Sequence, residues 1–189
     1  MDGLQIALLI IVIVVFIVLV IVLWVISTIN SFRRMQIKIN ESESGIDVAL
    51  TKRFDLLTKL FQAVKGSMKH EQETLAKIVK MRTPEHNAPI SEKQDFANKV
   101  TGGLDAINVV LENYPDLKAA QNILQLQKST AEVEENLSAI RRIYNSNVSI
   151  YNQKLAVFPS NIIANSKKLT KKDFFVAEET KKQDVKFDF

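Results

Sequence analysis

The stretch "LENYPDLKAAQNILQLQ", Leu111 to Gln127, places a proline inside a pattern that otherwise predicts helix. The residue before a proline is biased away from the helical conformation, so a helix that precedes it should end near Tyr114. Pro115 suits the first turn of a new helix, and Asp116 complements the positive end of that helix. We therefore interpret "NYPD" as a turn between two helices, and not as a kink or a ligand site.

Apolar residues at helical spacing predict long helices on both sides of this turn. The upstream helix should open at Ser91-Glu92-Lys93-Gln94, which has the form of a capping box. The downstream helix should run from about Asp116 to Phe158 and end before Pro159. The expected inner face of the upstream helix is Phe96, Val100, Leu104, Ile107, Leu111 and Tyr114. That of the downstream helix is Leu117, Ala120, Leu124, Val133, Leu137, Ile140, Tyr144, Tyr151, Leu155 and Phe158.

A third apolar stripe, with alternating steps of four and three residues, predicts one continuous helix from Leu50 to Arg82. Pro84 and Pro89 mark the loop that follows this helix. The stripe consists of Leu50, Phe54, Leu57, Phe61, Val64, Met68, Glu71, Leu75, Ile78 and Arg82. The predicted fold is therefore all-α, with an antiparallel bundle of three long helices and a short C-terminal tail.

Residues 6–26, "IALLIIVIVVFIVLVIVLWVI", contain no polar side chain. A helix of this length spans about 30 Å, the thickness of the hydrocarbon core of a bilayer. A cleaved secretory signal is disfavoured because the run is too long, only Asp2 is charged before it, and no small-x-small site follows. We expect a single retained transmembrane helix that contacts the lipid bilayer.

The charges that flank the apolar run predict its orientation. Arg33, Arg34 and Lys38 follow the run, whereas Asp2 is the only charged side chain before it. The positive-inside rule then predicts an outside N-terminus and a cytoplasmic C-terminal domain. The expected organisation is an anchor over residues 1–32, a bundle over 33–165 and a tail over 166–189 that packs on the bundle or is partly extended.

Several kinds of chemistry are disfavoured by the sequence. The chain has no cysteine, so disulfides and thiol nucleophiles are excluded. His70-Glu71 begins a zinc-protease motif, but the second histidine would be residue 74, which is Thr74. No Glu-x-x-His pair, Gly-rich phosphate loop or nucleophile elbow occurs, and no basic stripe is interleaved with aromatic residues. We expect no catalytic residue, cofactor, metal or nucleic-acid partner.

The motif Ile-Tyr-Asn occurs twice, seven residues apart, at Ile143-Tyr144-Asn145 and Ile150-Tyr151-Asn152. Seven residues are two helical turns, so both Tyr-Asn pairs should lie on one face of the helix. This face is either a core tyrosine ladder with asparagines along its edge or a binding face, and aromatic residues at this spacing favour the core. Beyond it, residues 173–180 are compatible with a short helix, and "DVKFDF" at the end with an extended segment.

A polar layer is expected inside the bundle, because Glu71 interrupts the apolar stripe of the first helix. If the helices run antiparallel with Arg82 level with Ser91, Glu71 lies near Thr101 on the second helix. The same count places it near Ser129 and Thr130 on the third. A buried carboxylate needs such partners. The layer either fixes the helix register or forms a small polar pocket.

Several motifs together resemble the LemA family over about residues 30–189. They include "GIDVALTKRFDLL" from Gly45, "YPDLKA" from Tyr114 and "IRRIYNSNVSIYNQKLAVFPSNIIA" from Ile140. The positions that carry the family signature are Asp55, Tyr114, Pro115, Asp116, Gln127, Arg141, Tyr144, Asn145, Tyr151, Asn152 and Pro159. The resemblance implies a bacterial single-pass protein of the inner membrane with an antiparallel helical domain. It implies no reaction, so no catalytic site is carried over.

These observations favour a membrane-anchored interaction or scaffold protein without catalytic activity of its own. Its partners are expected to be membrane proteins, proteins close to the membrane, or further copies of the chain. The alternative is an accessory or regulatory subunit of a membrane enzyme or protease complex.

Overall fold

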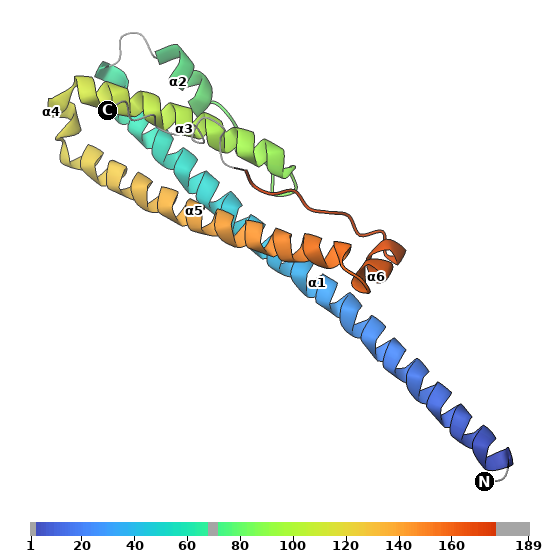
Figure 1. Cartoon of the computed structure of the whole chain (residues 1–189). Coiled ribbons are helices and arrows are strands. Elements are labelled where there is room, and N and C mark those ends of the chain that lie inside the picture. Colours follow the sequence, from blue (N-terminus) through green and yellow to red (C-terminus); the bar gives the residue numbers. More distant parts are fainter. Residues whose placement is uncertain (1–2, 68–71, 177–189) are drawn as a thin grey trace, which may run out of the picture. The chain divides into compact units, whose positions relative to one another are not determined.

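The computed structural model describes residues 3–67 and 72–176 of the chain, and every regular element in them is a helix. The all-α class expected from the sequence is confirmed. The elements are α1 (Gly3–Val64), the 3-10 helix η1 (Lys65–Ser67), α2 (Gln72–Val79), α3 (Ile90–Asn113), α4 (Pro115–Lys118), α5 (Gln121–Ala156) and α6 (Ser160–Ser166) (Figure 1).

The chain divides into two compact units. Unit 1 is formed by the chain up to Asn40 together with residues 147–172, and unit 2 by residues 41–146 and the chain from Asp173 onward. Two helices, α1 and α5, contribute to both units.

Unit 1 contains the apolar start of α1, whose side chains are exposed from Leu4 to Ile26 except for the partly covered side chain of Val25. Within the described residues, α1 is the one helix long and apolar enough to cross a membrane, and this makes it a candidate membrane span. Packing begins just beyond the apolar run. Phe32 is buried and meets the ring of Tyr151 edge to face, with the ring centroids 6.0 Å apart.

Unit 2 has a core of apolar side chains from α1, α3 and α5. The stripe expected on the first helix is buried at Leu50, Leu57, Phe61 and Val64, and Leu60 beside it is buried as well. The face expected on α3 is buried at Phe96, Val100, Leu104, Ile107 and Leu111. The apolar faces of both helices are therefore turned toward the core of the unit, as their spacing predicts.

The turn at Tyr114 is formed as the sequence predicts. α3 ends at Asn113, and Tyr114 caps both α3 and the helix that follows. Pro115 is the first residue of α4, where its missing N–H group costs no helical hydrogen bond. The helix expected from Asp116 onward is nevertheless interrupted, because α4 ends at Lys118 and α5 begins at Gln121.

The expected continuous helix from Leu50 to Arg82 is wrong, because α1 ends at Val64. Lys65-Gly66-Ser67 forms a 3-10 turn instead, and glycine in a helix costs about 1 kcal/mol relative to alanine. The chain then returns through α2. This return brings Ile78 of α2 against Gly103 of α3, at the point where Gly103 also meets Leu57.

The return through α2 makes α1 and α3 parallel, which corrects the antiparallel register assumed for these two helices. Glu43, Arg53 and Leu57 of α1 contact Lys93, Ala97 and Gly103 of α3, in that order. Residue numbers therefore increase in the same direction along both helices. α5 runs antiparallel to α1, because Ile140 lies against Gly45 and Glu134 contacts Arg53.

Three smaller expectations also need correction. Pro89, and not Ser91, occupies the N-cap of α3, and no side chain caps that helix end. On the downstream helix, Leu124 and Phe158 are exposed, while Ile123 is buried. Residues 173–176 form no helix, and residues 177–189, with the expected "DVKFDF" segment, lie outside the described residues.

Candidate membrane-proximal site

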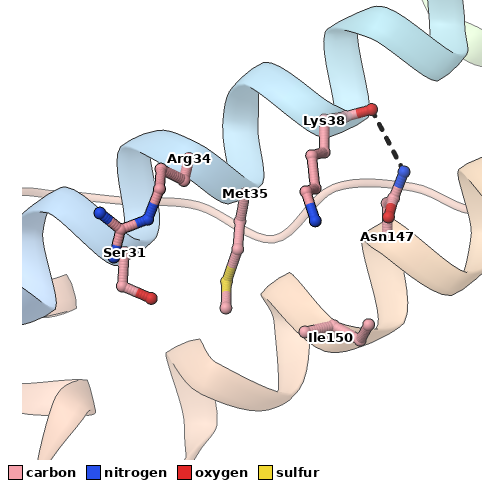
Figure 2. A pocket seen from close by; sticks show the side chains of 6 residues that line it. All are labelled: Ser31, Arg34, Met35, Lys38, Asn147 and Ile150. Atoms are coloured by element: carbon pink, nitrogen blue, oxygen red, sulfur yellow. Dashed lines mark hydrogen bonds between the residues drawn. The ribbon is translucent and has the colours of Figure 1, made fainter.

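A pocket of about 200 Å³ lies between α1 and α5 in unit 1 (Figure 2). Its lining residues are Ser31, Arg34, Met35 and Lys38 of α1 and Asn147 and Ile150 of α5. The Asn147 side-chain amide donates a hydrogen bond of 3.2 Å to the Lys38 carbonyl, which joins the two helices beside the pocket. Two cationic side chains next to apolar carbon suit an anionic group such as a phosphate.

The charged side chains of the segments that form this pocket are all positive. Residues 27–40 and 147–172 contain eight basic side chains and no Asp or Glu. The eight are Arg33, Arg34, Lys38, Lys154, Lys167, Lys168, Lys171 and Lys172. Sequence reasoning noticed only the first three, because the others follow 116 or more residues later and join them only through the fold.

A second pocket, of about 180 Å³, lies where α6 and the residues after it meet α1. Its lining residues are Ile29, Phe32, Arg33 and Gln36 of α1, Ile163 and Lys167, and Leu169. The lining is mostly apolar, with the two cations Arg33 and Lys167. These two pockets therefore lie on the part of α1 that directly follows the apolar run.

The second Ile-Tyr-Asn motif lies in unit 1. Tyr151 is 1 % exposed, and its hydroxyl accepts a hydrogen bond of 3.4 Å from the side-chain amide of Gln36. Asn152 binds the backbone of Lys172 twice: its amide donates to the carbonyl at 2.8 Å, and its oxygen accepts from the N–H at 3.0 Å. Asn152 thus holds the segment that follows α6.

The first motif makes the same kind of contacts in unit 2. Tyr144 is 2 % exposed, and its hydroxyl donates to the carbonyl of Asp173 at 3.1 Å. Asn145 forms two hydrogen bonds of 2.8 Å with the backbone of Phe175. Burial raises the pKa of Tyr144 to about 12, with further contributions from the negative charges of Glu43 and Asp173. Both tyrosines are therefore core residues, and both asparagines bind the C-terminal segment of their own chain.

Unit 2 also contains a buried ammonium that sequence reasoning missed. Lys93 is fully buried, and its Nζ lies 2.8 Å from Glu43 Oε1, 2.8 Å from Asp47 Oδ1 and 2.7 Å from the His86 carbonyl oxygen. His86 Nδ1 in turn lies 2.7 Å from Asp47 Oδ2. An ammonium has three N–H donors, so this set uses all of them. The sequence does contain a sign of this burial, because Lys93 lies three residues before Phe96 and therefore on the apolar face of α3.

Thr101 and Thr130, two residues of the expected polar layer, line a pocket beside Arg53. Arg53 is buried, donates to the Ala97 carbonyl at 3.1 Å and forms an ion pair of 2.7 Å with Glu134. The pocket beside this pair has a volume of about 300 Å³. Its polar lining includes Thr101, Asp105, Asn108, Gln127 and Thr130. The hydroxyls of Thr101 and Thr130 each donate to a carbonyl of their own helix.

The other predicted site residues are placed as follows. Glu71 lies outside the described residues, so a layer centred on its carboxylate stays a prediction. Ser129 is half-buried on α5. Arg141 stacks over the ring of Phe175, 4.5 Å from the ring centroid. Exposed positions are Asp55, Tyr114, Pro115, Asp116 and Pro159.

Comparison with known proteins gives two concordant findings. The LemA family model matches residues 42–189. Protein LemA of Metamycoplasma hominis is 29 % identical over 158 residues, which cover 82 % of this chain and 72 % of that protein. The family match covers well over half of the chain, including both Ile-Tyr-Asn motifs and the C-terminal segment that they hold, and the chain therefore belongs to the LemA family.

Proposed function

We propose that this protein is a membrane-anchored helical interaction protein, in which α1 holds the folded units at a bilayer surface. The observation that carries the proposal is the exposed apolar run of α1, which continues without a break into packed helix. A run of this composition favours insertion by roughly 6–12 kcal/mol. Water is a poor environment for such a surface, and a bilayer is the environment that matches its length.

Carbonate extraction of cell membranes that contain the full chain tests the anchor. The variant Val14→Lys/Ile17→Lys adds two charges at the middle of the run, at a cost of roughly 5–7 kcal/mol in insertion. The matched control is Val14→Leu/Ile17→Leu. We expect the wild type and the leucine variant to resist extraction and a larger share of the lysine variant to be released, because two lysines offset most of the insertion preference. Release of the wild type would contradict the anchor.

We further propose that the C-terminal domain faces the cytoplasm of a bacterial cell, at its inner membrane. The support is the set of eight basic residues in unit 1, against the single charged side chain of Asp2 before the apolar run. Cytoplasmic segments next to a span carry an excess of Lys and Arg. The basic set is larger than the flank Arg33, Arg34 and Lys38 alone, because α5 and α6 return to the same part of α1.

The proposed role is presentation of protein surfaces, not catalysis. Its support is the lack of any motif in the sequence for acyl transfer, phosphoryl transfer or metal-assisted hydrolysis. Crosslinking in intact membranes, followed by identification of the captured proteins, tests this role. Many partners, or further copies of the chain, would support it. A single enzyme captured in fixed stoichiometry would contradict it and favour an accessory subunit.

A further inference from the structure

The corner between α5 and α6 carries three exposed apolar side chains. Val157, Phe158 and Ile162 are 58 %, 74 % and 56 % exposed. Beyond the apolar run of α1, no large hydrophobic side chain among the described residues is as exposed as Phe158. Exposed apolar side chains that lie together are one mark of a contact with a protein or a membrane.

The level of this corner along α1 follows from contacts within unit 1. Asn147, Tyr151 and Lys154 of α5 contact Lys38, Gln36 and Ser31 of α1, in that order. The two segments are therefore antiparallel. Three to four residues beyond Lys154, Val157 and Phe158 are level with the first residues that follow Ile26. With a rise of about 1.5 Å per residue, the corner lies within roughly 5 Å of the end of the apolar run along the helix axis.

The surroundings of the corner are cationic. All charged side chains of residues 27–40 and 147–172 are Lys or Arg. Lys154 joins α5 to α1 through a hydrogen bond of 2.5 Å to the Ser31 hydroxyl. Lys167, Lys168, Lys171 and Lys172 are exposed. An apolar tip surrounded by cations matches the interface of an anionic bilayer, where acyl chains lie below a layer of phosphates.

We propose that the α5–α6 corner is a second membrane contact, which places Phe158 in the interface of an anionic phospholipid surface while the surrounding lysines bind headgroup phosphates. The proposal rests on the proposed function, because α1 must first bring unit 1 to the bilayer. A protein partner is less well matched, since the patch has three side chains and every charged side chain of residues 27–40 and 147–172 is positive. The bilayer offers both the apolar layer and the counter-charge at the required level.

The chain has no cysteine, so a single cysteine gives a clean label. Full-length protein with Val157→Cys, labelled with a polarity-sensitive fluorophore, is reconstituted into nanodiscs of phosphatidylcholine with or without phosphatidylglycerol. Nitroxide lipid in the same discs quenches labels that reach the bilayer. Val18→Cys in the apolar run is the control for the anchor. Val109→Cys, exposed on α3 in unit 2, is the control for labels that stay in water.

We expect the Val157 label to be quenched nearly as strongly as the Val18 label in anionic discs, and the Val109 label to be unaffected. Adding Phe158→Asp, or Lys167→Gln with Lys171→Gln, should reduce the quenching several-fold. Quenching at Val18 without quenching at Val157 would overturn the second contact and leave the anchor intact. Loss of quenching at Val18 would overturn the anchor itself. A blue-shifted but unquenched Val157 label would show a protein cover and also overturn the proposal.

Discussion

Lys93 holds a positive charge where a leucine or isoleucine would be expected. Its position on the inner face of α3 removes the ammonium from water, and such a charge is tolerated only if its partners replace the lost hydration. Here two carboxylates and one carbonyl oxygen do so, from α1 and from the loop that precedes α3. The same contact ties three segments together at the start of α3, an end that has no side-chain cap.

Replacing Lys93 by methionine should destabilise unit 2 strongly. The substitution keeps the length of the side chain but leaves the carboxylates of Glu43 and Asp47 without their shared cation. Removing one partner of a buried ion pair costs about 3–5 kcal/mol, and we expect the lower end because both carboxylates keep some contact with water. Thermal unfolding of full-length protein in detergent, followed by circular dichroism, measures the effect. Lys99→Met, at an exposed position of α3, is the control, and equal melting temperatures would contradict the prediction.

Tyr144 should make the fold sensitive to alkaline pH. Its pKa is raised to about 12 in the folded chain, above the ordinary value of 10.0. The unfolded chain therefore loses this proton first, so the stabilisation is complete below pH 10 and is lost as the pH rises from 10 toward 12. The loss should be roughly 2–3 kcal/mol, at about 1.4 kcal/mol per pKa unit.

Unfolding by urea across this pH range, for wild type and Tyr144→Phe, measures the effect. The phenylalanine variant has no proton to lose at this site, so the difference between the two stability curves should narrow above pH 10. Tyr114→Phe, at an exposed position, should leave the wild-type curve unchanged. A constant difference between wild type and Tyr144→Phe at every pH would contradict the raised pKa.

At the scale of the elements, periodicity predicted faces better than it predicted helix ends. The buried faces of α3 and of the second half of α1 follow the expected spacing, and Pro115 marked the turn correctly. The break after Val64 was missed because the apolar stripe continues at the same spacing into α2. An apolar stripe shows which side of a helix is buried. The same spacing occurs whether one helix carries the whole stripe or the chain turns back and a second helix carries the rest.

The candidate site was less predictable for a related reason. The cations of unit 1 come from two segments far apart in the sequence, and the partners of Lys93 come from α1 and from the loop that precedes α3. The local sequence pattern of a segment does not show which distant segments it contacts in the fold. The asparagines of the two Ile-Tyr-Asn motifs were noticed through their repeat, but their role depends on the tail, whose path has no periodic signal.

The C-terminal segment should be released locally by substitution of Asn145. Asn145→Ala removes both hydrogen bonds to the backbone of Phe175, and two such bonds contribute about 1–3 kcal/mol. We expect hydrogen exchange at the Phe175 amide to rise roughly tenfold or more, since each 1.4 kcal/mol corresponds to a factor of ten. Helical amides of α3 should keep their protection. Ser146→Ala, the exposed neighbour, is the control, and unchanged exchange in Asn145→Ala would contradict this role.

At the scale of the whole molecule, charge is divided between the units. Unit 1 has eight basic residues and Asp2, while seventeen basic and twenty acidic residues belong to unit 2. Only the unit that carries the candidate span is strongly basic. This division favours a surface of opposite sign next to unit 1, whereas the charges of unit 2 are nearly balanced.

The proposed orientation can be measured with single cysteines. In intact cells, a membrane-impermeant thiol reagent should label Asp2→Cys and leave Lys99→Cys unlabelled until the membrane is opened. Lys99 is exposed on α3, so its lack of reaction would come from the membrane and not from burial. The reverse pattern would place the C-terminal domain outside the cell.

The hydrogen bonds of Asn145 and Asn152 go to the main chain of Phe175 and Lys172, and every residue except proline offers the same pair of groups. These two contacts therefore cannot distinguish one tail sequence from another. Substitutions at Lys172 should be tolerated by its partner, whereas few residues other than asparagine offer both a donor and an acceptor at the required length. Over evolution, the asparagines should change slowly while the side chain at Lys172 drifts.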